Sequence, residues 1–188
     1  MYDFADQKRI VYIAFAIILL ISSAVAPVAV FYPVKVIFIT PAATAVGTSF
    51  VSLITGGLGL ALIAAGFFAL ALLENRMKRY LAAGLLFAVG ILGVLLSLSD
   101  YYYVTPDGFT YNGPFSISSQ SYQWEDFEKI EERIGTQDNT RSVQSIALYF
   151  KNGDIIEMSS GKIYEMSGTL ISNIKEAGGS HERINLEE

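Results

Sequence analysis

The sequence contains no cysteine, one histidine and very little charge in its first half. The lack of cysteine excludes disulfides, thiol nucleophiles and cysteine metal sites. His181 lies near the C-terminal end among Ser, Glu and Arg, so a Ser-His-Asp triad or a histidine-based metal site has no framework here. Between Ile10 and Leu98 the charged residues are limited to Lys35, Glu74, Arg76, Lys78 and Arg79.

Long apolar runs occupy the nearly uncharged first half of the chain. A bilayer core about 30 Å thick requires about 20 apolar helical residues to cross it. Three runs meet this requirement, and none has a charge in its interior: residues 10–32, 47–73 and 80–98. We therefore predict an all-α bundle of three transmembrane helices over residues 1–99, in a multi-pass protein of the cell membrane.

Two alternatives to three retained spans are open at this point. The first run follows two basic residues and contains a small-x-small pattern at 24–26 that fits a signal-peptide cleavage site, although Pro27 directly after it disfavours cleavage. Residues 36–73 could instead form a tight hairpin that turns at Gly56 and Gly57. That arrangement would give four helices, two of them short, and could place the C-terminal part in the cytoplasm.

Basic residues predict the orientation of the helices. One expected end of the bundle holds most of them: Lys8, Arg9, Arg76, Lys78 and Arg79. The first loop, at the other end, holds only Lys35. Because Lys and Arg concentrate in short cytoplasmic loops, we predict a cytoplasmic N terminus and an extracytoplasmic C-terminal domain.

Small residues recur at every fourth position of the second run, at 57, 61, 65 and 69. Such spacing lets helix backbones approach closely. It fits packing among the helices of this chain and also a dimer face, so it leaves the oligomeric state open.

The C-terminal half changes to a charged composition with short alternating runs. Residues 99–188 hold 15 Asp and Glu against 7 Lys and Arg. Strand-forming runs such as 101–105 and 143–150 alternate with Pro-Asp-Gly and Asn-Gly turns, and residues 163–174 show helical spacing of apolar side chains. We predict a small α+β domain over residues 100–179, followed by a loose polar tail over 180–188.

Four segments of this domain resemble the bacterial PH-like domain of small membrane proteins from Gram-positive bacteria: Tyr101–Phe109, Gly113–Phe115, Tyr122–Ile130 and Val143–Ile174. The resemblance covers roughly the last 80 residues. It implies an antiparallel β-barrel closed by one C-terminal helix, and it implies no catalysis. Some proteins with this domain are similar to membrane proteins that protect against peptide bacteriocins. We expect the only tryptophan, Trp124, to lie in the core of the domain.

A cluster of carboxylates is the candidate partner-binding face of the domain: Glu125, Asp126, Glu128, Glu131 and Glu132. Such a face attracts cations and basic partners, and the simpler interpretation is an acidic face that is merely solvated. Lys129 and Arg133 interleave with it and no EF-hand spacing is present, so we expect no metal and no other cofactor. The acidic charge disfavours nucleic acid and anionic lipid heads as ligands of the domain.

These features predict a non-enzymatic protein that contacts the lipid bilayer and presents an extracytoplasmic PH-like interaction module. Its partner would be a protein or a cationic peptide, in an immunity or regulatory role. The alternative is an accessory subunit of a membrane transporter or channel complex, although transport usually requires ionisable groups at membrane depth and we expect none inside the three spans. An enzyme would have only the carboxylate cluster to use.

Overall fold

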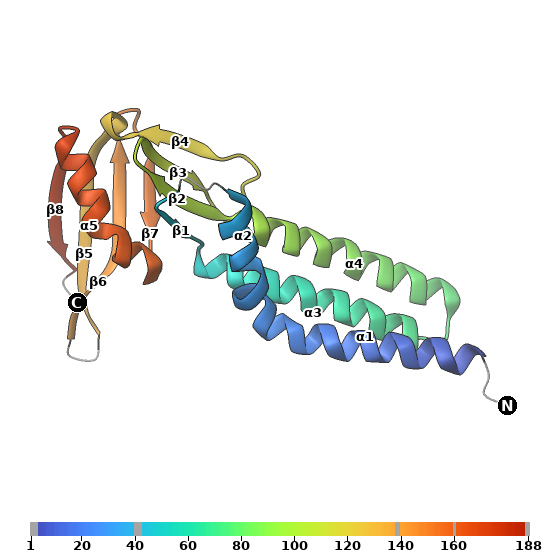
Figure 1. The fold of residues 1–188 in the computed structure, drawn as a ribbon. Helices are drawn as coiled ribbons and strands as arrows, with labels where there is room; N and C mark the ends of the chain where they lie inside the picture. The colour runs from blue at the N-terminus through green and yellow to red at the C-terminus, as the bar shows by residue number, and fades with distance from the viewer. Residues whose placement is uncertain (1–3, 40–42, 138–139, 160, 187–188) are drawn as a thin grey trace. The chain divides into compact units, whose positions relative to one another are not determined.

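The computed structural model describes residues 4–39, 43–137, 140–159 and 161–186. These residues form two compact units. The first unit contains the apolar helices, and the second contains the strands and the C-terminal helix. The helical segments of the first unit are α1 (Phe4–Ala26), η1 (Pro27–Phe31), α2 (Tyr32–Ile39), α3 (Phe50–Leu72) and α4 (Arg76–Ser99) (Figure 1).

Three helices of the described chain are long and apolar enough to cross a membrane, which confirms the predicted number of candidate spans. They cover Gln7–Phe38, Phe50–Leu72 and Arg76–Ser99, with 32, 23 and 24 residues. The first continues through η1 and α2, beyond the predicted end at residue 32. Helix α3 runs without interruption through Gly56 and Gly57, so the alternative of a hairpin at these glycines is wrong.

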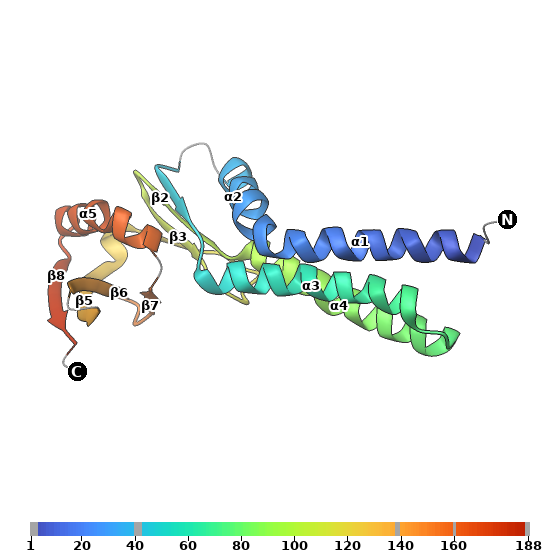
Figure 2. The same ribbon diagram turned by 90° about the horizontal axis from the view of Figure 1, so that it is seen from below.

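The first span changes direction at Pro27. Proline has no backbone N–H and its ring conflicts with the carbonyl of the preceding turn. The helix accommodates this with a π-helical segment, in which the backbone N–H of Tyr32 donates to the carbonyl of Pro27. Figures 1 and 2 show α2 turned away from the axis of α1. The helix therefore continues past the proline but along a new direction.

Small residues of α3 pack against both neighbouring helices of the same unit. In Figures 1 and 2, α3 runs beside α1 and α4. A Cβ on Gly59 would lie 2.8 Å from the carbonyl oxygen of Gly90 in α4. A Cβ on Gly57 would lie 2.8 Å from the carbonyl oxygen of Ser23 in α1. Gly57, the first residue of the predicted small-residue spacing, thus packs within the chain, as does Gly59.

The second unit consists of two four-stranded sheets and one helix. The first sheet has the order β1 (Ala45–Gly47), β2 (Tyr101–Thr105), β3 (Gly108–Asn112) and β4 (Gln120–Gln123). The second has the order β7 (Ile155–Met158), β6 (Thr140–Phe150), β5 (Phe127–Gln137) and β8 (Ser180–Asn185). Helix α5 (Gly161–Glu176) contacts the second sheet at β5, β6 and β8.

The predicted closed antiparallel barrel is not found among the described residues. The chain leaves the first sheet after β4, makes the 3₁₀ turn η2 (Trp124–Asp126), and enters the second sheet at β5. Strands β4 and β5 therefore belong to different sheets, and each sheet keeps two edges. The pairing of β8 with β5 is also parallel, whereas all other pairs are antiparallel.

Strand β1 extends the second unit beyond the predicted boundaries of 100–179. It comes from the segment between α2 and α3, where the sequence predicted a loop and the start of the second span. It pairs antiparallel with β2, with Ala45 opposite Val104 and Gly47 opposite Tyr102. The folded domain is therefore assembled from two segments that are separated by the α3–α4 hairpin.

Strand β8 lies in the region predicted as a loose polar tail. Residues Ser180–Asn185 pair with β5, from Lys129 opposite Ser180 to Ile134 opposite Asn185. The chain reaches this position because Gly178, with a φ of 91°, ends α5 in the left-handed conformation that glycine favours. Backbone pairing, rather than an apolar pattern, therefore orders this polar segment.

The two sheets and α5 share one apolar core. Its largest fully buried side chains include those of Tyr102, Phe109, Phe127, Phe150 and Leu170. Trp124 is only 8% exposed, stacks on Phe127 with ring centroids 5.5 Å apart, and donates from Nε1 to the carbonyl of Pro106 at 2.9 Å. The prediction that Trp124 is a core residue is confirmed.

Gly47 tests whether β1 is an integral part of the domain. A Cβ at this position would overlap the ring of Tyr102, which is buried. We expect Gly47→Ala to destabilise the second unit by about 1–3 kcal/mol because the core must shift to admit a methyl group. The measurement is urea unfolding of the full chain in detergent micelles, followed by the fluorescence of its single tryptophan, which lies in this unit.

The matched control is Gly168→Ala in α5, where an added Cβ meets no atom within 4 Å. This variant should unfold at the same urea concentration as the parent protein or slightly higher, because Ala favours helix by up to about 1 kcal/mol over Gly. Equal midpoints for Gly47→Ala and the parent protein would mean that the β1 pairing contributes nothing to the domain.

Candidate functional site

The predicted acidic face is divided by the fold into exposed and buried carboxylates. Glu125, Asp126 and Glu128 are exposed, whereas Glu131 and Glu132 are each only 4% exposed. Because side chains alternate along a strand, the two buried carboxylates point to opposite faces of β5. The five residues therefore do not form one continuous solvated surface.

Glu131 lies in an ion-pair cluster on one face of the second sheet. Its carboxylate accepts from Lys129 Nζ at 3.1 Å and from Arg133 Nε at 2.9 Å. The same two cations also contact Glu182 at 3.0 Å and Glu157 at 2.8 Å. Burial acts to raise the pKa of Glu131, but the hydrogen bonds from Arg133 and Lys129 outweigh it, and the pKa is lowered. Glu131 is therefore a paired carboxylate.

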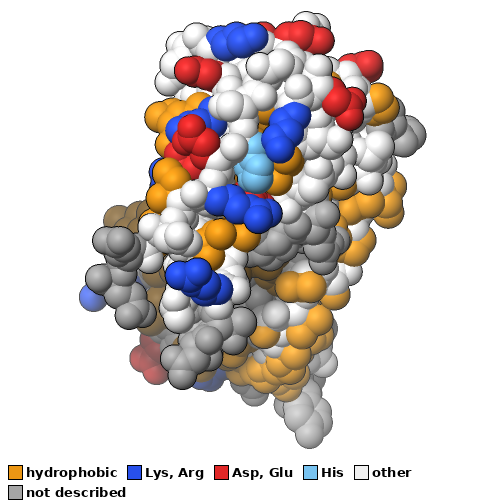
Figure 3. Space-filling view, turned by 90° about the vertical axis from the view of Figure 1, so that its left-hand side faces the viewer, with side chains coloured by type: hydrophobic (Ala, Val, Ile, Leu, Met, Phe, Trp, Pro, Cys, Tyr) orange, Lys and Arg blue, Asp and Glu red, His pale blue; other side chains and the backbone are white. Residues whose placement is uncertain are grey.

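Glu132 is paired on the opposite face of β5, which is the face turned toward the core. Its Oε2 accepts from Arg183 Nε at 2.7 Å and lies 3.0 Å from His181 Nε2. Burial acts to raise the pKa of Glu132, but these hydrogen bonds and the positive charges lower it. Figure 3 shows the single histidine between basic side chains. The site residues that the sequence did not connect, His181 and Arg183, come from β8.

Tyr122 is a polar core residue at the edge of the aromatic cluster. Its hydroxyl lies 2.9 Å from Gln120 Oε1 and 3.1 Å from Asp154 Oδ2. Burial, together with the hydrogen bond to Asp154, raises the pKa of Tyr122 to about 12. The tyrosine is therefore a neutral hydrogen-bond donor at physiological pH, and its contacts describe a structural role.

A groove of about 400 Å³ lies between the first sheet and α5 within the second unit. Strand β1 and the end of β2 form one wall, and α5 forms the other. The described lining residues are Thr44, Ala45, Val104, Thr105, Pro106, Met166, Thr169 and Asn173. None of these lining residues is ionisable, so the groove differs sharply from the charged surface of the second sheet. The sequence did not reveal it because β1 was not predicted.

Lys35 is a buried charge that the sequence analysis placed in a loop. It lies in α2, is 4% exposed, and donates from Nζ to Ser52 Oγ at 2.9 Å and to the carbonyl of Asp100 at 2.7 Å. Ser52 Oγ in turn donates to the carbonyl of Ser97 at 2.7 Å. The expectation that the candidate spans contain no ionisable group is corrected for this residue. These contacts link α2, α3 and the end of α4.

Comparisons of the chain with protein-family models, with curated proteins and with solved structures found no match. The resemblance to PH-like domains therefore stays a prediction. Two features of the second unit bear on function: the carboxylates of β5, two of which are held in ion pairs, and the groove beside α5, whose described lining is uncharged.

The paired state of Glu132 predicts how the domain responds to acid. Because its folded pKa is lowered, the carboxylate stabilises the fold above its ordinary pKa of 4.5, and this contribution is lost as the pH falls through the lower folded value. We expect Glu132→Gln to lower the free energy of unfolding by about 1–3 kcal/mol at pH 7. The difference from the parent protein should shrink below pH 4.5, as measured by urea unfolding with tryptophan fluorescence.

Glu128→Gln is the control, because Glu128 lies on the same strand with an exposed side chain. Its effect should stay within about 0.5 kcal/mol at both pH values. If Glu132→Gln behaved like this control, the ion pair with Arg183 would have no part in stability.

Proposed function

We propose that the chain is a multi-pass membrane protein whose folded domain is a non-enzymatic, extracytoplasmic interaction module for a protein or peptide. The membrane assignment rests on the three candidate spans, which are long and apolar enough to cross a bilayer. The interaction assignment rests on the uncharged groove between β1 and α5. The resemblance to PH-like domains is consistent with both.

The pairing of β1 with β2 supports a topology with an odd number of spans. Strand β1 follows the first span, and β2 follows the third. Because they are neighbours in one sheet, both strands must lie on the same side of the membrane. This agrees with three spans, since the second and third spans then cross the membrane and return between β1 and β2. The described part of the first loop, residues 43–49, has no Lys or Arg, whereas the starts of α1 and α4 are basic, with Lys8, Arg9, Arg76, Lys78 and Arg79. The positive-inside rule then favours an extracytoplasmic domain.

The groove is a better partner site than the acidic face. Its lining of Ala, Val, Pro, Met and neutral polar side chains suits a neutral peptide segment that buries an apolar side chain. Within the acidic face, by contrast, Glu131 and Glu132 already have cationic partners. The exposed Glu125, Asp126 and Glu128 add a negative rim that would steer a partner rather than hold it.

The orientation can be tested by cysteine labelling, because the natural chain has no cysteine to remove. Met77 is 81% exposed at the start of α4, and Ser119 is exposed in the second unit. In intact cells, Met77→Cys should resist a membrane-impermeant thiol reagent and react only after permeabilisation, whereas Ser119→Cys should react at once. The reverse pattern would overturn the proposed orientation.

The groove can be tested by site-specific photo-crosslinking in cells that contain the full chain. A benzophenone amino acid at Thr169, in the groove, should give a discrete protein adduct. The same probe at Ser172, an exposed residue of α5 that does not line the groove, should not. The Thr169 adduct should disappear when Asn173→Arg places a charge in the groove.

Identical adducts at Thr169 and Ser172, or an adduct that persists with Asn173→Arg, would exclude the groove as the binding site. An adduct with a polytopic transport protein in constant ratio would instead favour the alternative of an accessory transporter subunit.

A further inference from the structure

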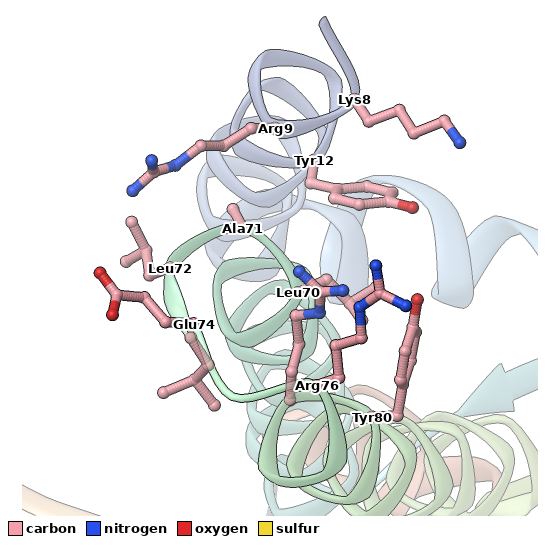
Figure 4. A pocket seen from close by; sticks show the side chains of 11 residues that line it. Lys8, Arg9, Tyr12, Leu70, Ala71, Leu72, Glu74, Arg76 and Tyr80 are labelled. Atoms are coloured by element: carbon pink, nitrogen blue, oxygen red, sulfur yellow. The ribbon is translucent and has the colours of Figure 1, made fainter. Parts of the chain in front are cut away.

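A second cavity lies within the first unit, at the end of the bundle where α1 begins and α3 passes into α4. Its volume is about 620 Å³. Four cationic side chains line it, Lys8 and Arg9 from α1 and Arg76 and Arg79 from α4. Figure 4 shows Arg76 directed toward Tyr12. Two segments that are distant from each other in sequence thus bring positive charge to one space.

The cations of this cavity have no carboxylate partner in the described part of the chain. None of the four forms an ion pair within 4.0 Å there. Glu74 also lines the cavity, but Figure 4 shows its side chain directed away from Arg76. The guanidinium of Arg79 lies 5.1 Å from the ring centroid of Tyr80. The cavity therefore holds a net positive charge that an anion can neutralise.

The start of α4 does not provide the anion site by itself. The backbone N–H groups of Met77 and Lys78, in its first turn, already donate to the side chain of Asn75 at 3.0 and 3.2 Å. The side-chain cations from two helices, and not the helix terminus, supply the attraction. Apart from Glu74 and two tyrosines, the rest of the lining is apolar and includes Leu70, Leu72 and Leu73.

We propose that this cavity binds the phosphate of an anionic phospholipid headgroup. Lys and Arg grouped between helices at a membrane surface, with tyrosines at the same level, match the charge and polarity of a lipid headgroup. Phe15, 52% exposed on α1 one turn beyond Tyr12, continues an apolar surface from the cavity along the span. An acyl chain can follow this surface, which a free phosphate cannot use. The proposal rests on the membrane insertion proposed above.

The test measures lipid binding to the purified full chain in micelles of a neutral detergent, with native mass spectrometry as the readout. Dioleoylphosphatidylglycerol should bind, and dioleoylphosphatidylcholine should bind at least tenfold more weakly. Arg76→Gln and Arg79→Gln should each weaken phosphatidylglycerol binding about fivefold, because each removes one cation near the phosphate. Lys8→Gln should weaken it in the same direction.

Lys78→Gln is the matched control, because Lys78 is an exposed cation of the same helical turn that does not line the cavity. Its affinity for phosphatidylglycerol should equal that of the parent chain. An equal loss for Lys78→Gln and Arg76→Gln would reduce the effect to general surface charge and overturn the proposal, as would equal binding of the two lipids.

An excess of inorganic phosphate distinguishes a lipid headgroup from a free phosphate as the ligand of the cavity. The lipid should remain bound in its presence, whereas displacement would assign the cavity to a free phosphate and overturn the lipid assignment. Micelle measurements depend neither on the orientation of the chain nor on a partner in the groove. Failure of this proposal is therefore distinguishable from failure of the proposed function.

Discussion

The pairing of β1 with β2 is the constraint on which the second unit depends. It joins the segment before α3 to the segment directly after α4, so the α3–α4 hairpin is closed by two neighbouring strands. The domain therefore cannot be completed until the third candidate span has been synthesised. The ring of Tyr102 occupies the space that a side chain at position 47 would need, so glycine allows this closure without a shift of the core. The groove beside α5 exists because β1 supplies part of its wall.

Length and hydropathy were enough to predict the three candidate spans, because a long apolar run has few other structures available. The same reasoning ended the first span too early, at residue 32, whereas the helix continues through α2 to Ile39. Strand β1 was missed because three residues are too few for a periodic pattern. Strand β8 was missed because it is polar and depends on a parallel partner distant in sequence. The two open sheets follow from these pairings, which local sequence does not encode.

The carboxylates of β5 show where prediction of the site was limited. Two cations, Lys129 and Arg133, flank Glu131 at spacing two, and on a strand this spacing places all three on one face. The ion pairs of Glu131 with these two cations could therefore have been predicted from the sequence. The partners of Glu132 were not, because His181 and Arg183 meet it only through β8. A buried ion pair is costly to break but weak evidence for added stability, so these residues define the register of β5 and β8 more than a binding surface.

The charged side chains of the first unit fall into two groups that differ in their hydrogen-bond and ion-pair partners. Lys35 is buried, and its ammonium donates to Ser52 and to the carbonyl of Asp100, so its role is to join helices. The cations around the cavity at the other end have no ion-pair partner among the described residues. The positive-inside rule accounts for their presence on one side of a membrane, but not for their convergence on one cavity from α1 and α4. The fold brings these cations together around one cavity. Binding of an anionic headgroup explains this arrangement, which membrane topology alone does not.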